Sequence, residues 1–256
     1  MTYYVSRAIN IIAFLTLAFS CLVPNALAQS NAIPTDKPLK LCIVLDKSGS
    51  MPTTAFAQLQ KHQLDILTSQ ITEYSGEVSV IAVREESNVP LIRYYVGSIV
   101  PPEMPELKGN AQQKRMLMNN YKKSALHYLM ARRKRPAMYA EGLEAFNDAA
   151  YPVIESPANA SRTDLWGAVH RCRNYLNESN LSWSIKPIKV MFLISDAVDT
   201  GGKPPIKDFP SDIHVFFVYN QVGAPFLKGI RYNQFEGIDE AIRELLALAD
   251  LYEVSQ

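Results

Sequence analysis

The fold is decided by the stretch Leu41-Cys42-Ile43-Val44-Leu45-Asp46-Lys47-Ser48-Gly49-Ser50. Its apolar half predicts a buried strand, and its polar half predicts a tight turn at the strand's carboxyl end. The turn presents one carboxylate and two hydroxyl groups, from Asp46, Ser48 and Ser50. Oxygen ligands of this kind suit hard cations such as Mg²⁺ or Ca²⁺. The stretch therefore indicates a cation site at the end of a buried strand.

Two further side chains with oxygen atoms occur downstream, each next to a predicted helix or strand. Thr163 precedes a helical pattern, and Asp196 ends a second apolar run that begins at Val190. In open parallel sheets, ligands lie outside the carboxyl ends of the strands, where the order of strands reverses. We therefore expect Asp46 and Asp196 to meet at one edge of the sheet. Helix capping by Asp46 and Ser50 is the alternative, but it explains neither downstream residue.

The order Asp-x-Ser-x-Ser, then Thr, then Asp resembles the metal-ion-dependent adhesion site (MIDAS) of von Willebrand factor A (vWA) domains. The resemblance implies that Ser48, Ser50 and Thr163 touch the metal directly. It also implies that Asp46 and Asp196 act mainly through metal-bound water. The sixth coordination position would be left for a carboxylate of a partner protein, and the metal would be Mg²⁺ or Mn²⁺, with Ca²⁺ as a further candidate.

Three residues that lie close to the expected ligands in the sequence extend this comparison. Ala197 departs from the family, which often has glycine at that position. Asp164 and Asp199 lie close to the ligands in sequence, and either carboxylate is a candidate for the layer of groups behind the ligands.

Strands and helices alternate along the rest of the chain, which predicts an α/β fold. We expect a doubly wound, mostly parallel sheet with helices on both faces, Rossmann-like as in vWA domains, with a helical insertion. The expected strands at residues 78–83 and 91–99 follow each other closely, which suggests an antiparallel hairpin at the sheet's edge. The expected strands are residues 40–45, 78–83, 91–99, 188–195 and 213–219, and the expected helices are residues 55–74, 164–176 and 238–252.

The first 28 residues have the pattern of a secretory signal peptide. Arg7 is the only charged side chain there, Ile11–Val23 is almost wholly apolar, and Ala26-Leu27-Ala28 is a small-x-small cleavage site. We therefore expect export and a periplasmic or secreted location. An uncleaved signal anchor and a lipoprotein attached through Cys21 are the alternatives.

Residues 29–39 are expected to form a linker and residues 40–256 a single vWA-like domain. The domain contains a basic helical insertion, residues 103–160, that a compact member of the family would not need. We expect its first helix to end at Pro136 and its second helix to run from Met138 to Ala149.

Charge is distributed unevenly within this insertion, although the whole chain carries a formal net charge of only +1. Between Leu107 and Ala140 there is no acidic residue. A basic amphipathic helix binds an acidic protein or an anionic envelope surface, or is merely solvated. Nucleic acid is not expected, because no recognised binding motif is present. The candidate partner-binding residues are Lys122, Lys123, Arg132, Arg133, Lys134 and Arg135.

Two cysteines lie within the expected domain, Cys42 on a strand and Cys172 on a helix. Both are expected about 13 Å below the cation site, from the rise per residue of strands and helices. The matching depth permits a disulfide in an oxidising compartment. Helix and sheet backbones, however, usually lie too far apart for one, which favours two buried thiols.

These features favour an exported, metal-dependent protein-binding module that captures an acidic residue of its partner. The alternative is a scaffold of an envelope or secretion assembly that binds through the basic insertion, with the metal site only structural. A remote alternative is a phosphatase of the haloacid-dehalogenase type. That chemistry requires a second aspartate where this chain has Ser48, so we expect no enzymatic activity.

Overall fold

The computed structural model describes residues 36–54, 57–85, 90–179, 183, 185–201, 209–219 and 230–251. The expected signal peptide, most of the expected linker and Tyr252 lie outside these described residues. Within the described ranges, none of the helices is both long enough and apolar enough to cross a membrane.

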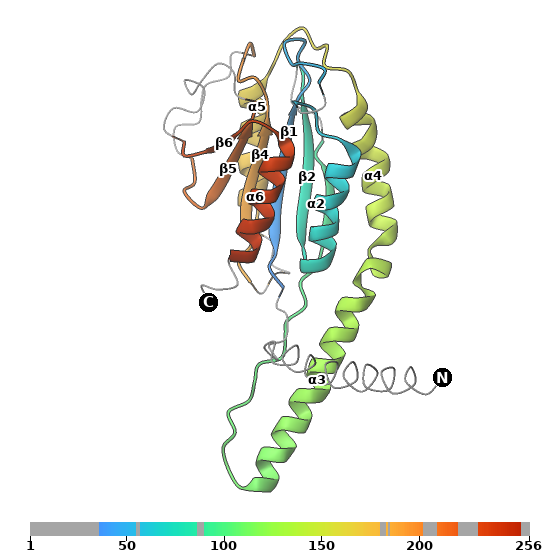
Figure 1. Ribbon diagram of the computed structural model, residues 1–256, viewed down its shortest axis with the longest axis vertical. Helices are drawn as coiled ribbons and strands as arrows, with labels where there is room; N and C mark the ends of the chain where they lie inside the picture. The colour runs from blue at the N-terminus through green and yellow to red at the C-terminus, as the bar shows by residue number, and fades with distance from the viewer. Residues whose placement is uncertain are drawn as a thin grey trace, which may run out of the picture. The chain divides into compact units, whose positions relative to one another are not determined.

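A six-stranded sheet forms the centre of the domain, in the order β3-β2-β1-β4-β5-β6 (Figure 1). All neighbouring strands are parallel except β2 and β3, which form the expected antiparallel hairpin. This confirms the predicted α/β, mostly parallel sheet. The strands are β1 (Leu39–Asp46), β2 (Gly76–Val83), β3 (Ile92–Val96), β4 (Ile188–Ile194), β5 (Ile213–Val218) and β6 (Asn233–Phe235).

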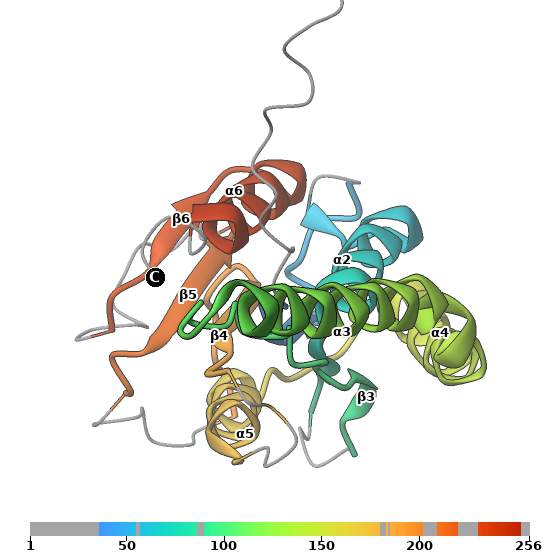
Figure 2. The same ribbon diagram turned by 90° about the horizontal axis from the view of Figure 1, so that it is seen from below.

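Helices cover both faces of the sheet, as predicted. Figure 2 shows α5 on one face and α2 and α6 on the other. Every residue of β1 is buried, and its side chains alternate between two cores: Leu41 and Ile43 face α2, while Cys42 and Val44 face α5. The helices are α2 (Lys61–Tyr74), α3 (Ala111–Met138), α4 (Ala140–Glu155), α5 (Leu165–Asn177) and α6 (Ile238–Leu251).

The order of strands reverses between β1 and β4. From β1 the chain crosses through α2 to β2 on one side, and later returns through α5 to β4 on the other side. The two strands are parallel, with Leu45 opposite Ile194, so their carboxyl ends lie side by side. This is the position where open α/β sheets bind ligands.

Several helix boundaries differ from the sequence prediction. The first helix begins at Lys61 instead of Ala55, because Gln60 caps it: its backbone N–H donates to Oε1 of Gln63 over 2.8 Å. The helix expected to end at Pro136 continues to Met138. Pro136 is tolerated in the last turn of α3, because the backbone N–H of Tyr139 donates the hydrogen bond that closes this turn.

The closing bond of α3 runs from the N–H of Tyr139 to the carbonyl oxygen of Arg135 over 3.1 Å.

The second helix of the insertion, α4, also extends beyond the expected end at Ala149, as far as Glu155. The short strand β6 was not predicted, since two of its three side chains are exposed and carry no apolar signal.

The two helices of the insertion differ in how they pack. Phe146, Ala150 and Ile154 of α4 belong to the larger of the two cores, so this helix is part of the main domain. In α3 only Tyr128 and Arg135 are buried. Figure 1 shows its N-terminal part running beyond the end of the sheet.

The last residues of the expected linker are part of the folded domain. Asp36 is buried, and the N–H of Lys37 donates to the carbonyl oxygen of Tyr74 over 3.1 Å. On the other side, Ile188 donates to the carbonyl oxygen of Pro38 over 2.9 Å. The boundary between linker and domain therefore lies before Asp36 and not after Leu39.

Candidate metal centre

Asp46 ends β1 with a buried carboxylate whose two oxygens both accept hydrogen bonds. Oδ1 accepts the backbone N–H of Ser48 over 2.8 Å, and Oδ2 accepts the hydroxyl of Ser195 over 2.6 Å. The second bond links the ends of β1 and β4 directly. Asp46 is therefore held beside Asp196, the residue that follows Ser195.

The two serines of the turn present their hydroxyl groups to each other. Ser48 Oγ and Ser50 Oγ lie 3.0 Å apart, the first buried and the second exposed. A short parallel bridge holds this turn against the segment that leads to Thr163: Gly49 donates to the carbonyl of Ala160, and Ala160 donates to the carbonyl of Lys47. The serine turn and the threonine loop are thus fastened together.

Thr163 is tied to the loop that follows Asp196. Its backbone N–H donates to Oγ1 of Thr200 over 2.7 Å, and Thr200 returns a bond to the carbonyl of Thr163 over 2.9 Å. Asp196 itself is buried, and its Oδ1 accepts the N–H of Val198 over 3.0 Å. Three loops far apart in sequence therefore converge at the carboxyl ends of β1 and β4.

Ala197 has a φ of 70°, in the left-handed region that favours glycine. The backbone of this loop thus adopts a conformation for which glycine is suited. The N–H of Ala197 donates to Ser195 Oγ over 3.0 Å, which helps to hold the residue in this conformation. Alanine in place of glycine at position 197 therefore changes the side chain without removing the turn.

Asp164 and Asp199 both cap the N-terminus of α5. Asp164 Oδ1 accepts the N–H of Gly167 over 3.1 Å, and Asp199 Oδ1 accepts the N–H groups of Leu165 and Trp166 over 2.8 and 3.2 Å. Carboxylates at a helix N-terminus satisfy free donors and complement the helix dipole. Both residues therefore position the segment that carries Thr163.

The pKa of Asp46 is raised, first by burial and in smaller part by the negative charge of Asp196. In the part of the chain that the structure describes, no lysine, arginine or histidine forms an ion pair with either aspartate. Two neighbouring carboxylates with no cationic partner are costly to bury, so a bound cation fits this site.

Among the described residues, no group of three or more His, Cys, Asp or Glu side chains is arranged to hold a metal ion. A cation at the ends of β1 and β4 would therefore depend on hydroxyl oxygens beside the two aspartates. That donor chemistry is the one Mg²⁺ accepts, because it keeps several water ligands and needs few from the protein.

Sequence reasoning did not single out Lys47, the residue between the first aspartate and Ser48. Its ammonium group is buried and points to the C-terminus of α4, where Nζ donates to the carbonyl of Ile154 over 2.7 Å. Burial lowers the pKa of Lys47 to about 8, with a smaller contribution from the charge of Arg84. The sequence around Lys47, an apolar strand followed by a polar turn, gives no local sign of its contact with Ile154.

Beside the serine turn is an open hollow of about 580 Å³. Arg84, which follows β2, and Arg162, which precedes Thr163, both line it. The wall also includes Glu85, whose Oε1 accepts the hydroxyl of Ser161 over 2.6 Å. The hollow is therefore lined by two arginines, one of which is the chain neighbour of the candidate ligand Thr163.

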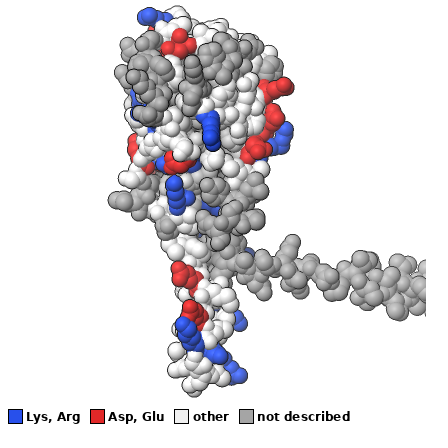
Figure 3. Space-filling model, turned by 90° about the vertical axis from the view of Figure 1, so that its left-hand side faces the viewer, with Lys and Arg blue, Asp and Glu red and all other residues white. Residues whose placement is uncertain are grey.

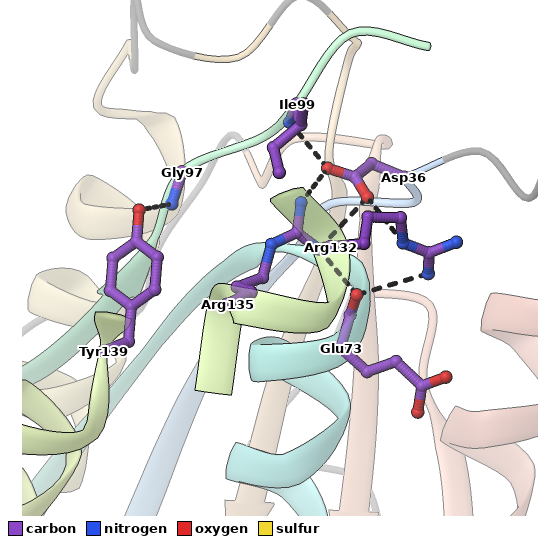
Figure 4. A network of polar contacts seen from close by, with 7 residues as sticks. All are labelled: Asp36, Glu73, Gly97, Ile99, Arg132, Arg135 and Tyr139. Carbon is purple, nitrogen blue, oxygen red and sulfur yellow. Dashed lines mark hydrogen bonds and ion pairs between the residues drawn. The ribbon is translucent and has the colours of Figure 1, made fainter. Parts of the chain in front are cut away.

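Two of the six candidate partner-binding residues, Arg135 and Arg132, make contacts within the fold. Figure 4 shows both side chains turned towards Asp36. Arg135 makes a two-pronged, buried ion pair with that carboxylate, with Nη2 2.6 Å from Oδ2 and Nη1 3.1 Å from Oδ1. Arg132 is mostly buried as well, with Nε 3.8 Å from Oδ1 of Asp36. Lys122, Lys123, Arg133 and Lys134 are exposed.

Helical spacing explains which basic residues are buried. Arg132 and Arg135 follow Tyr128 at steps of four and three residues, and so continue the inward-facing row of Tyr121 and Ala125. Both arginines also bond to the carbonyl of Glu73 at the end of α2. The apolar row on α3 was visible in the sequence and could have assigned these two arginines to the inner face.

Cys42 and Cys172 are buried free thiols. Cys172 Sγ donates to the carbonyl oxygen of Cys42 over 3.8 Å, and burial raises the pKa of Cys172 well above its ordinary value. This confirms the interpretation as two buried thiols and excludes the disulfide in this structure. Neither sulfur is placed to act as a nucleophile.

Comparison with known proteins leaves the family open. No model of a known protein family matches the chain, and no curated protein matches it. Among solved structures, it is similar to the pilus adhesin SpaC from Lactobacillus rhamnosus GG, with 15% sequence identity and a TM-score of 0.38. The similarity covers 87% of this chain but only 30% of the adhesin chain.

Proposed function

We propose that this protein is a metal-dependent protein-binding module of the vWA type. The observation that carries the proposal is the pair of buried carboxylates, Asp46 and Asp196, at the strand-order reversal, beside the paired hydroxyls of Ser48 and Ser50. These residues, together with Thr163, would hold Mg²⁺ or Mn²⁺. A bound metal would offer an open coordination position to a carboxylate oxygen of the partner.

The role of the protein's own residues is to hold the oxygens in place before a ligand arrives. Asp46 is fixed by Ser195, and the Thr163 segment is fixed by Thr200 and by the capped start of α5. A site whose donors are already oriented loses less conformational entropy on binding. This supports a binding role, which requires no group that transfers a proton.

The charge beside the site supports an acidic partner. Arg84 and Arg162 line the adjoining hollow, where they would attract a carboxylate and pair with a second acidic residue. Ser48 stands where a phosphatase of the type considered above needs its acid/base group, so we propose no enzymatic activity. We further propose that the protein acts after export, in a periplasm or outside the cell.

Calorimetric titration of the purified protein with Mn²⁺ and Mg²⁺ tests the metal site. Binding by the wild type that is lost in both Asp46→Ala and Asp196→Ala would support the proposal. Asp212→Ala is the matched control, because Asp212 is a surface carboxylate paired with Lys186 and Lys189. Absence of metal binding in the folded wild type, or equal binding by all four proteins, would overturn the metal site.

A further inference from the structure

The outer face of α3 is a surface that the candidate metal centre does not use. This helix has 28 residues, about 42 Å of length, and only two of them are buried. Figure 3 shows basic side chains gathered at the far end of the narrow part of the domain. Tyr128, Arg132 and Arg135 turn inward, which leaves the opposite face of the helix in solvent.

Large apolar side chains lie exposed on that outer face. Met116, Leu126 and Met130 are 58, 57 and 50% exposed, and Leu129 is 38% exposed. Grouped apolar side chains at the surface of a helix mark an interaction site more often than single ones do. Methionine adapts its shape to a partner, so its presence fits a recognition surface.

The same helix carries exposed basic side chains and no acidic residue of its own. The stretch from Leu107 to Ala140 contains no Asp or Glu, so no acidic residue of α3 neutralises the charge. Within the described ranges, none of the six exposed basic residues of this helix, named next, forms an ion pair. The exposed basic residues of α3 are Lys114, Arg115, Lys122, Lys123, Arg133 and Lys134.

The spacing of the two kinds of side chain indicates what this surface recognises. Lys122, Leu126, Met130 and Lys134 follow one another at intervals of four residues, so basic and apolar groups share one row on the helix. A helix that lies on a membrane separates its charged and apolar faces, which α3 does not do. A second copy of this chain would bring the same positive charge and be repelled.

We propose that the outer face of α3 docks an acidic, amphipathic helical segment of another protein. Leu126 and Met130 contact apolar side chains of that segment. The lysines around them pair with its Glu or Asp residues, as in helix pairs whose charged flanks select the partner. This docking surface is separate from the candidate metal centre and does not require a metal.

A synthetic helical peptide of Glu and Leu residues in heptad spacing is the probe, with binding followed by fluorescence anisotropy. Wild-type protein should bind the peptide in EDTA. Leu126→Ser with Met130→Ser, and separately Lys122→Glu with Lys123→Glu, should each weaken binding by about tenfold or more. Matched controls on other helices are Ile66→Ser on α2 and Arg243→Glu on α6, both exposed, and these should change affinity by less than about twofold.

Three outcomes would overturn this assignment. If a Glu peptide of equal charge that lacks Leu bound as tightly as the heptad peptide, the surface would be reduced to a site of non-specific charge. Binding to vesicles rich in phosphatidylglycerol, with no binding of the heptad peptide, would assign the face to a membrane. Peptide binding that requires Mn²⁺ and is lost in Asp46→Ala would place the peptide at the candidate metal centre.

Discussion

The ammonium nitrogen of Lys47 lies 2.7 Å from the carbonyl oxygen of Ile154, in the last turn of α4. The four last carbonyls of a helix have no partner within the helix, and a cation there also complements the helix dipole. This contact joins the turn between the first aspartate and Ser48 to the end of the inserted helix pair. The insertion therefore supports the loop that carries the candidate metal ligands.

Replacing Lys47 with Met should destabilise the domain by about 1–3 kcal/mol, because the buried carbonyl of Ile154 loses its hydrogen bond. Urea denaturation measures the change. Lys61→Met is the matched control at the same end of α4, since the contacts of Lys61 are at the surface, an ion pair with Glu155 and a cation–π contact with the ring of Tyr151. Its cost should stay below about 1 kcal/mol, and equal losses in both variants would contradict the role assigned to Lys47.

Replacing Arg135 with Met should cost about 3 kcal/mol or more, because it leaves the buried carboxylate of Asp36 without its main partner. Asp36→Asn, combined with it in a double-mutant cycle, should recover part of the loss. Arg133→Met, two residues away and exposed, should change the free energy of unfolding by less than about 0.5 kcal/mol. Additive losses in the cycle would show that the pair is not coupled.

Gly76→Ala and Gly142→Ala should have opposite effects on stability. Gly76 has a φ of 139°, and an added Cβ would lie 2.2 Å from the carbonyl oxygen of Leu39 on β1. That variant should lose more than about 1 kcal/mol. Gly142 is exposed on α4 with nothing within 4 Å of an added Cβ, so alanine there should gain about 0.5–1 kcal/mol. Thermal unfolding of the two variants checks the signs, and two shifts of the same sign would contradict this account.

Cys42 and Cys172 should resist alkylation in the native protein and react fully in denaturant without a reductant. Both thiols are buried, and the raised pKa of Cys172 keeps it in the unreactive thiol form. Mass spectrometry after treatment with iodoacetamide measures the modification of each residue. If the denatured protein remained unmodified until a reductant was added, the two residues would be joined by a disulfide.

Much of the fold could be predicted because its signals are local. Buried parallel strands appear as continuous apolar runs, and β1 and β4 were recognised in this way. The start of α2 was placed six residues too early because Leu59 is apolar and buried without being helical. β6 was missed since a three-residue strand with one buried side chain has no periodicity to detect.

Local patterns also placed Asp46 and Asp196 at the carboxyl ends of buried strands, since a polar residue after a buried run must lie where the strand emerges from the core. Sequence patterns gave Asp164 and Asp199 only as candidates for the layer of groups behind the ligands. Their role at the start of α5 depends on hydrogen-bond directions that spacing does not give.

The sequence by itself determined the types of the main elements, the mostly parallel sheet and the oxygen-rich turns at its carboxyl edge. These follow from hydrophobic period and turn chemistry, which act over a few residues. Only the tertiary structure decided that Arg135 is buried against Asp36 and that Lys47 binds the end of α4, contacts that span 99 and 107 residues. A charged side chain has the same appearance in a sequence whether it is solvated or buried, because its pairing partner is chosen by the packing of distant segments.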